Sequence, residues 1–401
     1  MQLRTVGLAE ITRVFLKIGA MSYGGPAIMG IMQAEVQERR QWIAKQDFVE
    51  GLALVNMLPG PGATQLGIFL GHAKRGLWGG ILAGTAFILP AFLIMLALSA
   101  AYEAFGAFAV ARHAFYGIGP VVVGVFAVAV YRLGRGTMTL RSQVAIGVAV
   151  LLLTLLSSIG LTITLLAAGC VGVALFHSRR TGLIALGVLA APFTGYALAA
   201  PELAMPAWFD APMQQSDLPD LSSLGLFFFK VGALTFGGGL SMLAFIQEQV
   251  VNQFHWLTPQ EFVDGLALGQ LTPGPVLMLA AFVGYKLAGV AGAAVAAGAI
   301  FLPSFVMMLS VLPLLQRMND LQWLRAFMRG VAPAVIGALG ASLAQMAPQA
   351  APDPFTACLL ILTVGVLLLR NIGPLPLVFG GAVLGLIAKA GLWERVERFA
   401  R

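Results

Sequence analysis

The chain has 401 residues, of which 59% are hydrophobic and 10% charged, and its mean hydropathy is +0.89. A water-soluble domain carries about 25% charged residues, so this composition excludes an ordinary soluble protein. The only two cysteines, Cys170 and Cys358, lie in apolar runs, which excludes a disulfide framework and a cysteine-based metal site. The net charge of +7 is spread over loops, where basic residues indicate membrane orientation and predict no nucleic-acid binding.

The chain begins with two apolar segments that glycine and proline interrupt. The first, 14–36, is broken at Gly24-Gly25-Pro26, and the second, 47–72, is broken at Pro59-Gly60-Pro61. Backbone inside a bilayer tolerates such breaks only where protein or a cavity surrounds them. Positive charge flanks both segments, so we interpret them as two re-entrant hairpins that enter and leave on the cytoplasmic face.

Apolar runs without charge follow, and most are long enough for a spanning helix of about 20 residues. They are 76–102, 113–131, 142–178, 181–201, 287–316, 330–352, 354–369 and 371–388. The run 142–178 is long enough for two helices. Four spans per copy and one linker helix give about nine crossings, or about thirteen if the broken segments cross fully. The acidic segment 201–223 has no Lys or Arg and is predicted to be an external linker.

The second half of the chain repeats the first at an offset of 213 residues, as the pairs Lys17/Lys230 and Arg112/Arg325 illustrate. A one-residue insertion shifts the next block, in which Phe48–Leu54 (FVEGLAL) matches Phe262–Leu268 (FVDGLAL) and Pro59-Gly60-Pro61 matches Pro273-Gly274-Pro275, and a later deletion restores the offset. Several loops that carry Lys and Arg in the first copy have no positive charge at the equivalent place in the second copy, as inverted topology requires. We therefore expect an all-α polytopic membrane protein, with two homologous repeats of inverted topology and broken or re-entrant helices near the midplane.

Four regions are predicted along the chain. The first repeat covers 1–180, a linker helix and external acidic loop cover 181–223, the second repeat covers 224–390, and a tail covers 391–401.

Each break exposes the first amides of the helix that restarts after it, and these amides carry partial positive charge. Such a site can hold an anion without a charged side chain, although a kinked helix with no ligand is the alternative. Hydroxyl and amide side chains near the breaks can donate to an oxyanion, or simply bond between helices. The predicted substrate-binding residues at the breaks are Ser22, Tyr23, Gly24, Gly25, Asn56, Pro59, Gly60, Pro61, Thr64 and Gln65, with Thr235, Gly237, Gly238, Gln270, Thr272, Pro273, Gly274 and Pro275.

Two pairs of charged residues recur in apolar surroundings. Lys17 and Lys230 are added to the predicted substrate-binding set because a cation within the membrane is costly. The alternatives are that they pair with Glu35 and Glu248 or reach to the membrane interface. The two glutamates are candidates for proton coupling or for structural ion pairs.

Nothing in the sequence indicates an enzyme. The four histidines are scattered, and no HExxH, GxSxG or phosphate-loop motif is present. We expect a transporter with no catalytic residue, no cofactor and no metal. Because no nucleotide-binding motif occurs, the energy should come from an ion gradient or the membrane potential.

The repeated Phe-x-Lys-x-Gly…Gly-Gly element, the Phe-Val-(Glu/Asp)-Gly-Leu-Ala-Leu block and the Pro-Gly-Pro motif resemble the chromate ion transporter family, over about residues 10–390. The resemblance implies a long, two-domain member in the bacterial inner membrane that exports chromate and confers chromate resistance, with sulfate as a related or competing oxyanion. A transporter of another small oxyanion, such as sulfate, and a passive anion channel are the alternatives. The expected partners are chromate, sulfate and the lipid bilayer, and a homodimer stays open.

Overall fold

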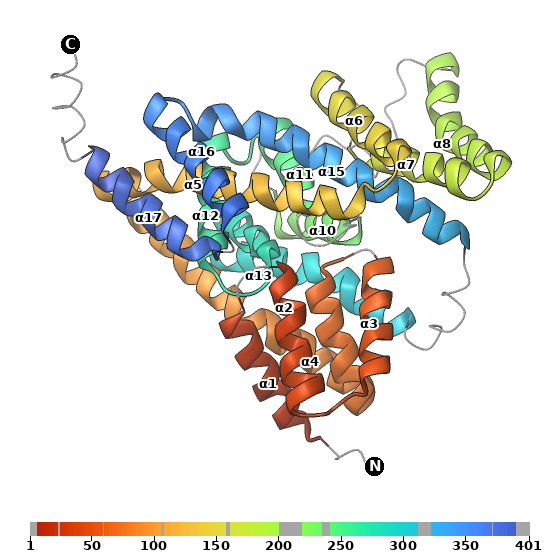
Figure 1. The fold of residues 1–401 in the computed structure, drawn as a ribbon, viewed down its shortest axis with the longest axis horizontal. Coiled ribbons are helices and arrows are strands. Elements are labelled where there is room, and N and C mark those ends of the chain that lie inside the picture. Colours follow the sequence, from red (N-terminus) through yellow and green to blue (C-terminus); the bar gives the residue numbers. More distant parts are fainter. Residues whose placement is uncertain are drawn as a thin grey trace.

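The computed structural model describes residues 6–22, 25–58, 60–105, 108–157, 161–199, 219–234, 241–311, 322–370 and 372–389. Helices dominate this part of the chain, and it contains no strand. The predicted tail, 391–401, and most of the predicted external loop lie outside the described residues. Figure 1 shows the first helices of the chain gathered at one end of the molecule, with the later helices of both halves crossing the rest.

The helices of the first half and the linker are α1 (Leu8–Met21), α2 (Gly25–Met32), η1 (Gln33–Arg39), α3 (Lys45–Met57), α4 (Gly62–Phe105), α5 (Ala109–Thr137), α6 (Arg141–Leu156), α7 (Leu161–Phe176) and α8 (Arg179–Ala199). Those of the second half are α10 (Leu221–Ala233), α11 (Ser241–Ile246), η2 (Gln247–Gln253), α12 (Pro259–Leu271), η3 (Val276–Met278), α13 (Leu279–Val311), α15 (Gln322–Ala350), α16 (Pro354–Leu369) and α17 (Pro374–Ile387). The short elements η1 and η2 are π-helical and η3 is 3₁₀-helical.

The broken segments fold back on themselves. Arg40, just after η1, forms a 3.0 Å ion pair with Glu10 in the first turns of α1, so the chain returns to the side from which it entered. A Cβ on Gly51 in α3 would collide with the ring of Phe69 in α4, which places these helices side by side around the intervening break. Re-entrant hairpins therefore describe the segments better than full crossings, and about nine crossings follow.

The helices α4 and α13 each contain a sharp turn that divides them in two. Non-helical dihedrals occur at Arg75-Gly76 and at Ala288-Gly289, and the two glycines have φ of +57° and +58°. A side chain is strained at such a φ, so glycine is the residue that fits here. The shorter first part of each helix closes a hairpin, and the longer second part is apolar enough to span a membrane.

The spans of the two copies pack on each other reciprocally. A Cβ on Gly172 in α7 would lie 2.5 Å from the carbonyl oxygen of Ala326 in α15, and one on Gly385 in α17 would collide with the carbonyl oxygen of His113 in α5. These two contacts are equivalent at the offset of 213 residues. Thus α15 of the second copy packs on α6 and α7 of the first. In the same way, α5 of the first copy packs on α16 and α17 of the second.

The equivalent helices α4 and α13 run antiparallel where they touch. A Cβ on Gly80 would lie 3.0 Å from Leu309, whereas one on Gly84 would lie 2.6 Å from Phe305. Residue numbers rise along one helix as they fall along the other. Equivalent helices that span the membrane in opposite directions mean that the second copy is inverted.

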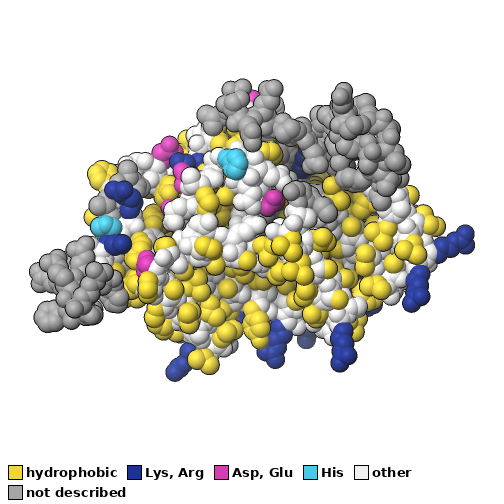
Figure 2. Space-filling view, turned by 90° about the horizontal axis from the view of Figure 1, so that it is seen from above, with side chains coloured by type: hydrophobic (Ala, Val, Ile, Leu, Met, Phe, Trp, Pro, Cys, Tyr) yellow, Lys and Arg dark blue, Asp and Glu magenta, His cyan; other side chains and the backbone are white. Residues whose placement is uncertain are grey.

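The surface agrees with a membrane setting. Figure 2 shows hydrophobic side chains in a broad band, with Lys and Arg along one edge and most of the visible Asp, Glu and His toward the other. Among the described residues, four helices are long and apolar enough to cross a membrane, and five shorter apolar helices accompany them. The chain is therefore a multi-pass membrane protein.

Candidate functional site

Breaks from both halves meet inside the protein. The backbone N–H of Gly274, in the second Pro-Gly-Pro motif, donates to the carbonyl oxygen of Ser22 at the end of α1, with a distance of 2.6 Å. Gly274 has φ of +95°, and a Cβ there would lie 2.9 Å from the Cβ of Ala91 in α4. We call the surroundings of Gly274, with Ser22 and Ala91, the second niche.

The first Pro-Gly-Pro motif has an equivalent position. Gly60 has φ of +129°, and a Cβ there would lie 2.6 Å from Oγ of Ser304 in α13 and closer still to Nε2 of Gln65 in α4. We call the surroundings of Gly60, with Gln65 and Ser304, the first niche. In both niches, a residue from α4 or α13 of the opposite copy faces the glycine, so each niche needs both repeats.

Three buried hydroxyls occur at or next to these breaks. Ser22, Thr64 and Ser304 are fully buried, and within the described part of the chain their oxygen atoms have no hydrogen-bond partner. A buried hydroxyl without a partner costs about 1–3 kcal/mol, so such groups usually serve a ligand or an ordered water. By contrast, the Thr272 hydroxyl donates to the Leu268 carbonyl oxygen at 2.8 Å.

The predicted substrate-binding residues fall into several groups. Pro61, Pro273 and Pro275 are buried beside the niches, and Gln270 is half-buried near the end of α12. Gly25 and Asn56 belong to α2 and α3, but their side chains lie outside the description. The predicted residues that lie wholly outside the described part are Tyr23, Gly24, Pro59, Thr235, Gly237 and Gly238.

The two lysines do not join the niches. Lys17 and Lys230 are exposed on the outward faces of α1 and α10. The buried stripe of α1 includes Ile11, Phe15 and Ile18, and Lys17 falls outside it. The structure therefore gives no support to a direct contact of these lysines with a ligand at the breaks.

The two glutamates hold equivalent hydrogen bonds to different partners. Glu35 accepts from Arg40 at 2.9 Å and from Arg39 at 3.2 Å, and these guanidinium groups hold its pKa below the ordinary value. Glu248 accepts from the amides of Asn252 at 2.8 Å and Gln253 at 3.4 Å. The carboxylate of Glu35 thus faces two cations, and that of Glu248 faces two neutral amides.

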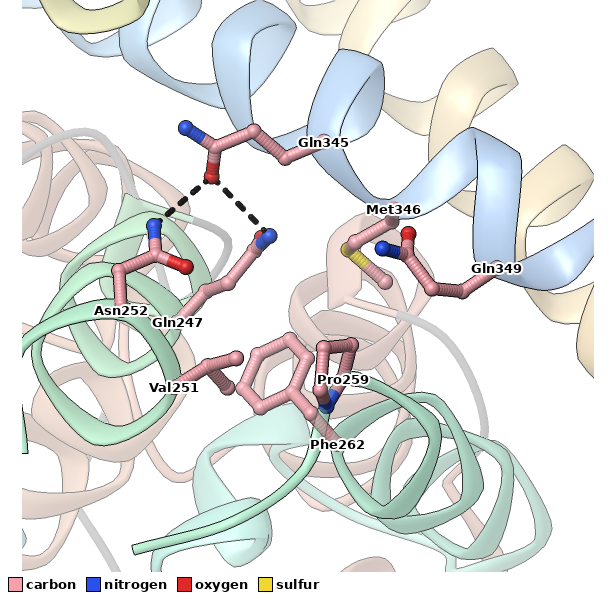
Figure 3. A pocket seen from close by; sticks show the side chains of 8 residues that line it. All are labelled: Gln247, Val251, Asn252, Pro259, Phe262, Gln345, Met346 and Gln349. Atoms are coloured by element: carbon pink, nitrogen blue, oxygen red, sulfur yellow. Dashed lines mark hydrogen bonds between the residues drawn. The ribbon is translucent and has the colours of Figure 1, made fainter. Parts of the chain in front are cut away.

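A cavity of about 370 Å³ lies beside Asn252 (Figure 3). Its lining residues are Gln247, Val251, Asn252, Pro259, Phe262, Gln345, Met346 and Gln349. The Oε1 atom of Gln345 accepts from Asn252 Nδ2 at 3.0 Å and from Gln247 Nε2 at 3.3 Å, as the dashed lines show. We call it the amide cavity, because carboxamides supply its polar groups.

Elements that line the amide cavity in the second copy carry arginines in the first copy. At the offset of 213 residues, Gln345 corresponds to Arg132, and η2, which carries Asn252, corresponds to η1, which carries Arg39. Because the copies are inverted, the arginines and the amide cavity lie toward opposite membrane faces. Basic residues favour the cytoplasmic face, so the amide cavity is assigned to the outer one.

One buried carboxylate was not singled out as a site from the sequence. Asp264, in the repeated block of α12, accepts hydrogen bonds from the Tyr102 hydroxyl at 2.8 Å and from Gln260 at 2.9 Å. Tyr102 belongs to α4, so this contact also joins the two copies. The sequence offered one signal for Asp264, because the equivalent position of the first copy also carries an acidic residue, Glu50.

Comparisons with known proteins agree with the geometry. A family model described as "Chromate transporter" matches residues 9–173 and again residues 222–386. The chain is 35% identical over 387 residues to the "Chromate transport protein" of Cupriavidus metallidurans, which covers 96% of this chain and 94% of the relative. It is 34% identical over 351 residues to the "Probable chromate transport protein" of Synechococcus elongatus, with 86% of each chain covered.

A third relative is the "Chromate transport protein" of Pseudomonas aeruginosa, at 33% identity over 353 residues, with 84% of this chain and 82% of the relative covered. No solved structure matches the chain. The family model fits both halves separately, as expected for two copies of one unit. The chain belongs to the chromate transporter family.

Proposed function

We propose that this protein exports chromate from the bacterial cytoplasm across the inner membrane and so confers chromate resistance. The observation that carries the proposal is the meeting of helix breaks from both repeats around buried hydroxyls that have no hydrogen-bond partner among the described residues. Backbone amides and hydroxyls donate hydrogen bonds to an oxyanion without a fixed charge that would hold it too tightly. Residues at the breaks, Gly60 above all, are proposed to surround the substrate.

The outward direction is supported by the charges at the two faces. The arginines near η1 and α5 raise the local concentration of a dianion at the cytoplasmic face. The equivalent outer position is the amide cavity, which offers hydrogen bonds but no positive side chain among its lining residues. A dianion would thus be gathered on one side and released on the other.

The membrane potential also favours export. Moving one elementary charge across 100 mV is worth about 2.3 kcal/mol, so a dianion gains about twice that on leaving a negative interior. Proton coupling is therefore not required by the energetics. Alternating access, in which the hairpins open first to one face and then to the other, is the proposed mechanism.

Everted membrane vesicles test the function directly, because export then becomes uptake into the vesicle. Saturable accumulation of labelled chromate, increased by an interior-positive potential and absent from vesicles without the protein, is the expected result. Absence of accumulation would refute the proposal. Stronger transport of sulfate would indicate another oxyanion as substrate, and chromate entry that neither saturates nor responds to a gradient would indicate a passive channel.

A further inference from the structure

The two niches occupy equivalent places but are built from different side chains. The first niche has Ser304 facing Gly60, whereas the second has Ala91 facing Gly274. Ser304 and Ala91 are repeat equivalents, because they differ by the offset of 213 residues. One niche therefore has a hydroxyl where the other has only a methyl group.

The residues that follow the two Pro-Gly-Pro motifs also differ, because those of the first copy are polar and those of the second are apolar. Thr64 and Gln65 follow Pro61 in the first turn of α4, whereas the apolar residues Leu277, Met278 and Leu279 follow Pro275. Leu277 and Met278 are buried in the apolar core. The first niche thus combines polar side chains with the amino terminus of a long helix, and the second combines apolar side chains with a short 3₁₀ turn.

The hydrogen bonds show which niche has donors available. In the second niche, the Gly274 N–H is used by Ser22, and the nearby Thr272 hydroxyl is used by Leu268. In the first niche, the Ser304 hydroxyl is fully buried, lies beside Gly60 and has no partner among the described residues. The hydroxyl of Thr64, one residue before Gln65, is also fully buried and has no partner among the described residues.

The hydroxyl of Ser22 does not alter this contrast. It is buried and has no partner in the described structure, and its carbonyl oxygen belongs to the second niche. Its repeat equivalent is Thr235, which also carries a hydroxyl. A hydroxyl at both positions cannot distinguish the niches, whereas Ser304 against Ala91 can.

We propose that each chain binds one tetrahedral divalent oxyanion, in the first niche, and that Ser304 of the second repeat is one of its ligands. Thr64, Gln65 and the first amides of α4 complete the donor set. The second niche has a structural role, in which Gly274 fastens the end of α1. This inference rests on the proposed function, because it takes an oxyanion as the substrate.

Gly60 explains why the substrate can approach the backbone. A side chain there would collide with Ser304 and Gln65, so only glycine lets the backbone lie this close to their polar atoms. The donors are neutral, and they come from both repeats. Rotation of one repeat against the other would therefore separate Ser304 from α4 and release the anion.

A reciprocal pair of substitutions tests the inference. Ser304→Ala gives the first niche the residue of the second, and Ala91→Ser makes the opposite change. A hydrogen bond to a charged group contributes about 1.5–3 kcal/mol, so Ser304→Ala should raise the KM for chromate in everted vesicles by about tenfold to a hundredfold. Ala91→Ser should leave the KM within about twofold of the parent, because no substrate contacts that position.

Calorimetric titration of the purified protein in detergent with chromate supplies the stoichiometry. One binding event per chain is expected, weakened by Ser304→Ala and unchanged by Ala91→Ser. Two events per chain, an unchanged KM in Ser304→Ala, or equal damage by both substitutions would overturn the inference. Size-exclusion chromatography checks that both variants stay folded.

The same design separates this inference from the proposed function. If the unmodified protein neither transports nor binds chromate, the proposed function fails, and the titration is repeated with sulfate. A tenfold weaker binding of sulfate by Ser304→Ala, with Ala91→Ser unchanged, would still support the single niche. Binding of sulfate that is insensitive to Ser304→Ala would refute it whichever oxyanion is transported.

Discussion

Gly274 and Ser22 are 252 positions apart in the sequence, yet the N–H of one donates to the carbonyl oxygen of the other over 2.6 Å. This bond ties the second Pro-Gly-Pro motif to the end of α1, so a break in one repeat supports a break in the other. Unwound backbone in a membrane protein must be satisfied by neighbouring protein, and here the opposite repeat supplies the partner.

Filling the first niche should stop transport. Gly60→Ala adds a methyl group 2.6 Å from the Ser304 oxygen, at a φ that alanine rarely adopts. We expect the rate of chromate uptake into everted vesicles to fall by about fivefold to a hundredfold, because about 1–3 kcal/mol of strain is added where the substrate would bind. Gly298→Ala is the matched control, since a Cβ there has nothing within 4 Å.

Replacing the whole first motif should have a larger effect. With Pro59-Gly60-Pro61 changed to three alanines, α3 and α4 are free to join as one helix, which removes the exposed amides. We expect transport to be abolished while the protein still inserts in the membrane, as measured by uptake and by membrane fractionation. Normal uptake by this variant would exclude the first break from the mechanism.

An arginine added to the amide cavity should make the release of the anion harder. Gln345→Arg gives the amide cavity the residue that the first copy carries as Arg132. A new charge near a dianion strengthens its binding, so chromate inside everted vesicles should inhibit further uptake several-fold more strongly than in the parent. Val144→Arg, on the exposed face of α6, serves as a control for added charge alone.

The ion pairs of Glu35 should make a small, pH-dependent contribution to stability. Arg40 and Arg39 lower the pKa of Glu35 from 4.5, so the stabilisation is present above that value and is lost as the pH falls through the lower pKa of the folded state. Its partners are partly exposed, so the effect should not exceed about 1 kcal/mol.

Thermal unfolding of Glu35→Gln in detergent checks this contribution. The melting temperature of the parent should exceed that of the variant near pH 7, and the difference should shrink as the pH falls below about 4.5. Glu248→Gln is the matched control, because amides and not guanidinium groups contact Glu248. A difference that does not change with pH would contradict the assignment.

Much of the architecture was predictable because glycine and proline constrain the backbone wherever they fall. The two Pro-Gly-Pro motifs predicted the breaks, and the repeat predicted inverted copies and the apposition of their breaks. The boundaries of the repeats, a homodimer, and the roles of Glu35 and Glu248 in proton coupling stay predictions.

The sequence alone did not show which way a residue faces on its helix, nor how the two repeats pack on each other. Lys17 was placed near the break because it stands seven residues before Gly24, but its angular position on α1 turns it outward. Ser304, after Pro303 in an apolar helix, looks like any small residue of a packed span. Its relation to Gly60 depends on the antiparallel packing of α4 and α13, which the sequence does not show.

The reciprocal packing of α5 and α15 on the last helices of the opposite copy has a consequence for biogenesis. Neither half can bury its glycine-lined surfaces until the other half has been made. At about 5–20 residues per second, synthesis of the remaining 200 or so residues takes roughly 10–40 s. During that interval the first half must wait in the bilayer as an incomplete bundle, with Gly117 and Gly172 facing lipid or an insertion chaperone.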